Sequence, residues 1–117
     1  MDLAREAARV DDQKTVIIWA SKAIEIEPSN ADARALRAHA LFLKGDWAAA
    51  RADLEAMPRA ELEVRPIVVA DHFVCLVELA DWAPAREASK AVPQSESARP
   101  DVVKAQQKLA LAKPPAN

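Results

Sequence analysis

The chain has 117 residues and a formal charge of −2, and it contains one Gly, one Cys, two His and no Tyr. That length suits a single compact domain, and the near-neutral charge lacks the basic surface typical of nucleic-acid-binding proteins. One Gly excludes the glycine-rich phosphate loops, which need at least two, and one Cys excludes an internal disulfide. Two His and one Cys do not favour a closed zinc site. We therefore predict no cofactor, no metal, no nucleic-acid partner and no catalytic residues.

The sequence carries no pattern typical of a membrane or export segment. Its most apolar stretch, Val64 to Ala80, is interrupted by charged side chains, whereas a membrane-spanning helix needs about 20 predominantly apolar residues. The N-terminus carries acidic residues where a signal peptide has basic ones. We expect a cytoplasmic protein, or a soluble module of a longer one, that does not insert into membranes.

Helix is the expected secondary structure throughout. Alanine occupies 27 positions, while β-branched and aromatic residues are few. In chain order, apolar periodicity and the intervening prolines predict seven helices, near residues 2–10, 13–27, 31–44, 47–57, 66–79, 82–92 and 100–112. The expected fold class is therefore all-α, and residues 113–117 are expected to form a disordered tail.

Three aspartates, Asp12, Asp46 and Asp81, stand where helices are expected to start. A carboxylate at that position can accept a hydrogen bond from a free backbone N–H of the first turn. Gly45, directly before Asp46, suits the left-handed residue that often ends a helix. Pro66 falls in the first turn of its helix, where a missing N–H is tolerated.

The chain repeats itself at a spacing of 35 residues. The segment GDWAAAR, which begins at Gly45, returns as ADWAPAR from Ala80, and a fainter copy begins at Asp11. Each copy marks the turn and the start of the second helix of a predicted helix–turn–helix unit. A single helix pair cannot bury its apolar face alone, so the units are expected to stack on one another.

The middle unit, residues 31–64, resembles the tetratricopeptide repeat family. Its matching small, bulky and turn residues are Ala38, Leu41, Gly45, Asp46, Trp47, Ala50 and Leu54. The preceding unit ends in Pro28-Ser29-Asn30, similar to the family's proline–asparagine end. The third unit keeps Leu76, Asp81-Trp82 and Ala85, but it carries Phe73 where a small residue is usual.

The resemblance implies a right-handed α-solenoid of antiparallel helix pairs. One domain would span residues 1–112, with repeats at about 1–30, 31–64 and 66–99 and a capping helix at 100–112. Phe73 would loosen or shift the packing of the third repeat. Trp47 and Trp82 would fill the space between helices, which leaves Trp19 as the aromatic side chain best suited to contact a partner.

The resemblance also implies a binding site. In the family, the first helix of each pair lines a concave groove that holds a helical or extended peptide. Here the groove would be basic at its N-terminal end and apolar beyond it, with Phe42, Val74 and Val77 as anchors. The implied groove residues are Arg5, Arg9, Asp32, His39, Phe42, Leu43, Ile67, Val74, Val77 and Glu78. The alternative is that some of these side chains pack against the capping helix.

The carboxylate clamp, with which some co-chaperones of this family grip the C-terminus of a heat-shock protein, is expected to be absent. Such a clamp needs Asn and basic residues on successive first helices, because a buried carboxylate requires charged donors. Leu36 stands where the clamp has Asn or Arg, and Asp32 and Asp71 would repel the carboxylates of the ligand.

The chemically reactive side chains do not predict a catalytic site. His39 and His72 lie 33 residues apart, at different positions of their repeats, so we expect them to point in different directions. Cys75 lies in an apolar run without an adjacent base, which favours a structural role.

The sequence thus favours a non-catalytic module that binds a segment of another protein. Two alternatives stay open: a small tetratricopeptide-type chaperone of a secretion or assembly subunit, similar to those of type III secretion needles, and a co-chaperone-like adaptor without an intact carboxylate clamp. Self-association through uncapped ends is a further alternative.

Overall fold

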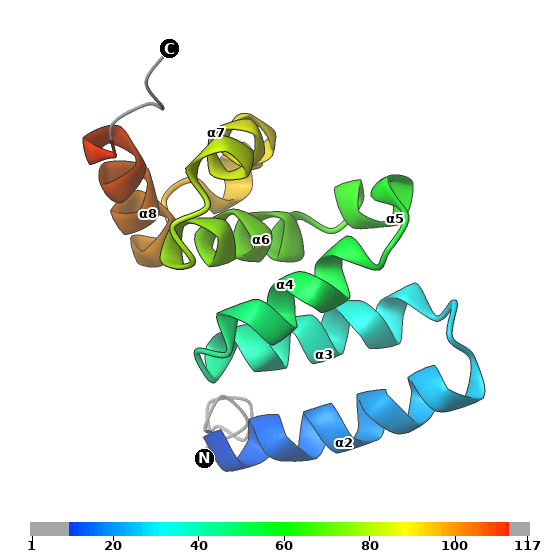
Figure 1. Ribbon diagram of the computed structural model, residues 1–117. Helices are drawn as coiled ribbons and strands as arrows, with labels where there is room; N and C mark the ends of the chain where they lie inside the picture. The colour runs from blue at the N-terminus through cyan, green and yellow to red at the C-terminus, as the bar shows by residue number, and fades with distance from the viewer. Residues whose placement is uncertain (1–9, 113–117) are drawn as a thin grey trace.

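The computed structural model describes residues 10–112, which form a chain of helices joined by short connections (Figure 1). The helices are α2 (Val10–Ile26), α3 (Ala31–Leu43), α4 (Trp47–Glu55), α5 (Arg59–Glu63), α6 (Pro66–Glu78), α7 (Trp82–Ala91), the short 3-10 helix η1 (Gln94–Glu96) and α8 (Pro100–Leu111). Within these residues there is no strand, so the all-α prediction is confirmed.

Helices α2, α3, α4, α6, α7 and α8 match predicted helices to within three residues at either end. The predicted helix 2–10 lies outside the described residues except for Val10, and the predicted tail 113–117 also lies outside them. Helix α5 was not predicted, because its five residues, RAELE, are too few and too polar to show an apolar period.

The helix start expected at Asp12 is wrong. Helix α2 already includes Val10, so Asp12 lies within it and the turn expected at this point does not form. The reason is local: no Gly or Pro occurs between Val10 and Glu27, and nothing else there breaks a helix.

The other two expected helix starts are confirmed. The side chain of Asp46 accepts a hydrogen bond from the backbone N–H of Ala49 at 3.4 Å. Asp81 directly precedes α7 but makes no such bond, and its carboxylate instead lies 2.9 Å from Arg51 Nη2 on α4. The same residue type at the same helix position thus serves two different contacts.

Helices α3, α6 and α8 form a row, with α6 in the middle. An ion pair between Asp32 and Arg65 joins the starts of α3 and α6, and one between Lys108 and Glu78 joins the ends of α8 and α6. The other helices pack against this row: α2 against α3, α4 against α3 and α6, and α7 against α6 and α8. Helix α6 is therefore the central element (Figure 1).

The core has two clusters of buried side chains. The larger surrounds α6 and includes Phe73 and Leu76, together with Val102 from α8. Trp47 and Trp82 are partly buried against it, as expected for residues that fill space between helices. The smaller cluster lies between α3, α4 and α6 and is built around Leu54.

Helices α3 and α6 end in two turns of the same type. Gly45 and Ala80 both adopt a left-handed conformation, with φ of 82° and 58°. The N–H of the residue after each donates to the carbonyl of Leu41 or Leu76, in each case at 2.9 Å. This is the Schellman geometry, which prefers glycine because a Cβ is strained at positive φ. The 35-residue repeat thus preserves the turn even where it has lost the glycine.

Substitutions at these two positions should change stability in opposite directions. Ala80→Gly removes the strain of a left-handed alanine and should raise the free energy of unfolding by about 0.5–1 kcal/mol, whereas Gly45→Ala should lower it by about 1 kcal/mol. The nearest atom to a Cβ on Gly45 would be Cζ2 of Trp47, at 4.0 Å, so the cost there comes from the backbone alone. Urea denaturation measures both changes, and a destabilising Ala80→Gly would contradict this geometry.

Candidate functional site

A buried carboxylate lies where α3, α6 and α8 meet. Asp71, on α6, is 0% exposed. His39 Nδ1, from α3, lies 2.6 Å from Asp71 Oδ2, and Arg99, which directly precedes α8, donates from Nη2 to Oδ1 at 2.9 Å. Three segments far apart in the sequence therefore meet at one side chain. We call His39, Asp71 and Arg99 the Asp71 cluster.

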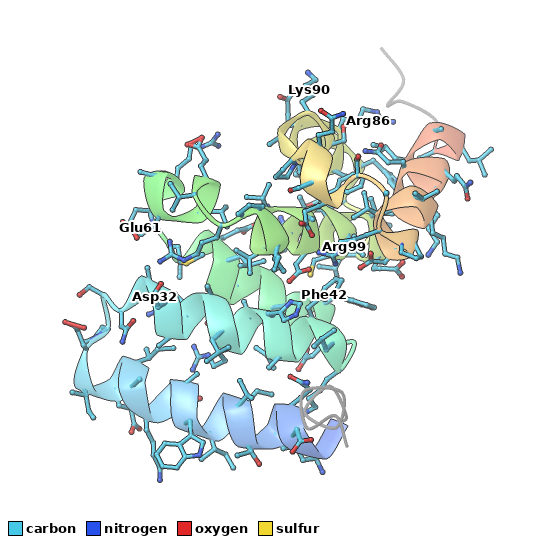
Figure 2. All side chains as sticks on the ribbon, turned by 180° about the vertical axis from the view of Figure 1, so that it is seen from behind. Asp32, Phe42, Glu61, Arg86, Lys90 and Arg99 are labelled. Carbon is cyan, nitrogen blue, oxygen red and sulfur yellow. The ribbon has the colours of Figure 1, made fainter. Side chains whose placement is uncertain are left out.

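Arg99 binds several groups besides Asp71. Its Nη2 donates to Asp101 at 2.7 Å, its Nη1 donates to Glu96 at 3.2 Å, and its guanidinium lies 5.7 Å from the centre of the Phe42 ring (Figure 2). The hydrogen bond with Asp101 raises the pKa of Arg99, although burial opposes it, and the same bond lowers the pKa of Asp101. The guanidinium of Arg99 is therefore a permanent positive charge that three carboxylates surround.

The three side chains expected to anchor a peptide are core residues. Phe42, Val74 and Val77 are only 6%, 3% and 2% exposed. They belong to the larger core cluster together with Val102 and Ala105 of α8. They pack in the cluster to which α8, the expected capping helix, contributes. This is the alternative that the sequence left open, and these three side chains do not line an open groove.

The other predicted groove residues remain accessible. Asp32, Leu43, Ile67 and Glu78 are exposed, and the side chain of His39 is 34% exposed. Arg5 and Arg9 lie outside the described residues.

Leu36 also belongs to this surface, although it was not among the predicted groove residues. It is 53% exposed, and on α3 it lies four residues after Asp32 and three residues before His39. Residues three or four apart share one side of a helix. Asp32, Leu36, His39 and Leu43 therefore form one line along α3, which we call the α3 stripe.

Neither acid that was expected to repel a carboxylate ligand is free to do so. Asp32 lies 2.5 Å from Arg65 Nη2, and Asp71 is buried in its cluster. Figure 2 shows Asp32 and Glu61 on the same side of the molecule, where Arg65 pairs with both. Both carboxylates on this face are thus paired within the protein, with Arg65 shared between them.

Two further charge clusters tie α4 to its neighbours. Asp53, which is 5% exposed, accepts two hydrogen bonds from Arg37 at 2.7 and 2.6 Å. Glu55 lies 2.8 Å from Arg51 Nε and 2.9 Å from His72 Nε2. His72 and His39 bind different carboxylates, which agrees with the expectation that they point in different directions.

The sequence carried one signal of the Asp71 cluster. Asp71 is an acidic residue inside the apolar run from Ile67 to Val77, and a charge on a buried helix face requires a partner. The partners could not be identified, because Arg99 is 28 residues away and His39 is 32 residues away in the other direction.

The His39–Asp71 pair has the geometry that orients a general base, but the described residues place no nucleophile on it. The His39 ring stacks on Phe42 with ring centres 6.2 Å apart. Cys75 is buried, and that burial raises the pKa of its thiol to about 12, so the thiol is protonated at neutral pH. Among residues 10–112, no three His, Cys, Asp or Glu side chains are grouped as metal ligands.

A hollow of about 510 Å³ lies on the opposite side of α6, between α5 and α7. Its apolar lining residues are Leu54, Met57, Leu62, Val69, Leu76, Pro84, Ala88 and Ala91. Glu63 and Glu87 stand among the polar residues around it. We call this hollow the α5–α7 groove. The unpredicted helix α5 supplies one wall, so the groove could not have been found from the repeat.

Comparison of the chain with known protein families, with curated proteins and with solved structures finds no match. No helix within residues 10–112 is both long and apolar enough to cross a membrane. The resemblance to tetratricopeptide repeats therefore rests on the sequence of this chain alone.

Removing the charge of Asp71 should destabilise the fold. Asp71→Asn turns an acceptor toward Arg99 into a group that also carries donors, and we expect a loss of about 2–4 kcal/mol in the free energy of unfolding. The matched control is Asp32→Asn, because the side chain of Asp32 is 90% exposed and its ion pair should contribute less than about 1 kcal/mol. Equal losses in the two variants, measured by urea denaturation, would contradict a structural role for the cluster.

The contribution of Asp101 should depend on pH. A lowered folded-state pKa means that folding favours the ionised carboxylate, so its stabilisation is present above the ordinary pKa of about 4 and is lost as the pH falls through the folded value. The stability difference between wild type and Asp101→Asn should therefore be larger at pH 7 than at pH 3. Urea denaturation at both pH values tests this, and a difference that grows on acidification would contradict it.

Proposed function

We propose that the protein is a non-catalytic interaction module of tetratricopeptide-like build, which binds a helical or extended segment of another protein along α3 and α6. Two features support this build: the repeated helix–turn–helix sequence, and the recurrence of the same left-handed turn after α3 and α6. The order α3, α6, α8, in which α6 contacts both other helices, is the order expected of the first helices in stacked pairs.

The observation that carries the proposal is the apolar surface left exposed on this row. Leu36 and Leu43 of the α3 stripe are 53% and 46% exposed, and Ile67 on α6 is 51% exposed. The Asp71 cluster holds α3 and α6 together beneath this surface, so the face is preorganised. Apolar side chains held on a rigid face are typical of protein interaction sites.

The geometry of the face indicates what kind of segment would bind. Leu36 and Leu43 are separated by two helical turns, or about 10 Å along α3. Their neighbours Asp32 and Arg65 neutralise each other. We therefore expect apolar anchors at a matching spacing in the ligand, with charge playing a minor part. A chaperone of an apolar secretion or assembly subunit is a narrower form of the same proposal.

Affinity capture with substituted proteins tests the proposal. Leu36→Glu combined with Leu43→Glu places two charges on the exposed α3 stripe without touching the core, and we expect partners captured by the wild type to be lost by at least about tenfold. Leu111→Glu is the matched control, because Leu111 is 84% exposed and lies at the end of α8, outside the α3 stripe.

A third variant tests whether partners bind in the α5–α7 groove instead of on the α3 stripe. Ala88→Glu introduces a charge into the α5–α7 groove and should leave capture unchanged. Loss of the same partners from Ala88→Glu, with capture retained by the Leu36→Glu, Leu43→Glu variant, would contradict the proposed face. Circular dichroism of every variant shows whether the fold is retained.

A further inference from the structure

Helix α2 has an outward side that no other described helix covers. It lies at one edge of the molecule and packs against α3 (Figure 1). Its inner side includes Gln13 and Ala20, which are 5% and 2% exposed. Ile18, Trp19 and Ile26 on the other side are 55%, 68% and 86% exposed. The helix thus exposes three large apolar side chains within nine residues.

These side chains share one side of α2 with a basic residue. Ile18, Trp19, Lys22 and Ile26 are spaced by one, three and four residues, which places them on one half of the helix surface. Lys22 Nζ lies 5.6 Å from the centre of the Trp19 ring. We call Ile18, Trp19, Lys22 and Ile26 the α2 face. An isolated exposed leucine would need no explanation, but a face of this composition is typical of an interface.

Opposite charges stand toward the two ends of the α2 face. Lys14 is exposed near its N-terminal end, and Glu25 is exposed near its C-terminal end. On a helical projection both lie on the same flank, beside Ile18. When two identical helices pack antiparallel, the same flank of each meets the other. Lys14 of one copy then lies opposite Glu25 of the second copy, and the contact occurs twice.

We propose that the α2 face binds the α2 face of a second copy of this chain, forming an antiparallel twofold dimer. Such a dimer requires a self-complementary surface, and a face with opposite charges at its ends meets that requirement. If Lys14 lies opposite Glu25, the twofold axis passes between positions 19 and 20, so the two Trp19 rings lie next to each other. This surface is distinct from the α3 stripe, so the proposal goes beyond the peptide-binding function.

The dimer should be weak and dependent on concentration. Helix α2 has 17 residues and is therefore about 25 Å long. A seam along one helix pair buries less than the roughly 800 Å² per partner of a standard interface. We expect a dissociation constant on the order of 10 μM rather than a permanent dimer.

Sedimentation velocity of the purified chain over about 1–300 μM tests the proposal. The wild type should shift from the 12.7 kDa monomer towards twice that mass as its concentration rises. Trp19→Glu should remain monomeric over the whole range, whereas Leu111→Glu, which changes an 84% exposed residue at the end of α8, should dimerise like the wild type. Circular dichroism and thermal melting at low concentration verify that both variants are folded.

A charge exchange tests the orientation of the two helices. Lys14→Glu should weaken the dimer about tenfold, because it creates two like-charge contacts, and adding Glu25→Lys should restore most of the affinity. A wild type that stays monomeric throughout, or dimers that persist in Trp19→Glu, would overturn the proposal. Binding of the monomer to phosphatidylserine vesicles through Trp19, without dimerisation, would assign the face to a membrane surface instead and would also overturn it.

Discussion

The buried carboxylate of Asp71 is the constraint on which the arrangement of α3, α6 and α8 depends. A carboxylate removed from water costs several kcal/mol unless charged or polar groups bind it. Here those groups come from α3 and from the start of α8, at 2.6 and 2.9 Å. Apolar packing has little directional preference, but these contacts require particular distances and angles. The cluster therefore fixes which residues of the three helices lie opposite one another.

Small side chains make the close packing around this cluster feasible. Ala38, Ala50, Ala70 and Ala85 are all 0% exposed, and they lie where neighbouring helices approach one another. Phe73, in contrast, is a large residue that is also 0% exposed, and it contributes to the larger core cluster around α6. Helix α6 thus holds the largest part of the core, and both of its sides are occupied by charge clusters or grooves.

The two exposed apolar surfaces differ in their electrostatics. The acid at the start of the α3 stripe is neutralised by Arg65, so this surface has no strong charge with which to select a ligand. The α2 face has exposed charges of opposite sign toward its two ends, a pattern that a second copy of the chain can match. Because the two surfaces are separate, a dimer through α2 would present two α3 stripes together. Such bivalent presentation strengthens binding to partners that are themselves paired.

Local features of the sequence were sufficient for most of the helices. Apolar periodicity, the prolines and the aspartates before α4 and α7 predicted six of the described helices, because these signals act within a few residues of where they occur. The same signals misplaced a helix start at Asp12, since an aspartate can also lie within a helix. They also missed α5, which is too short to show a period. The candidate site was predicted less well: Leu43 and Ile67 are exposed, whereas Phe42, Val74 and Val77 are buried.

By itself the sequence determined that this protein is helical, where most of its helices begin and end, and that one turn recurs after 35 residues. Only the tertiary structure decided that Arg99 and His39 converge on Asp71, that the core including Val102 and Ala105 of α8 takes in the expected groove anchors, and that α2 exposes an apolar face. The physical reason is one of range. Helix signals are read between residues a few positions apart, whereas burial and ion pairing depend on residues about 30 positions apart that meet only once the helices have packed.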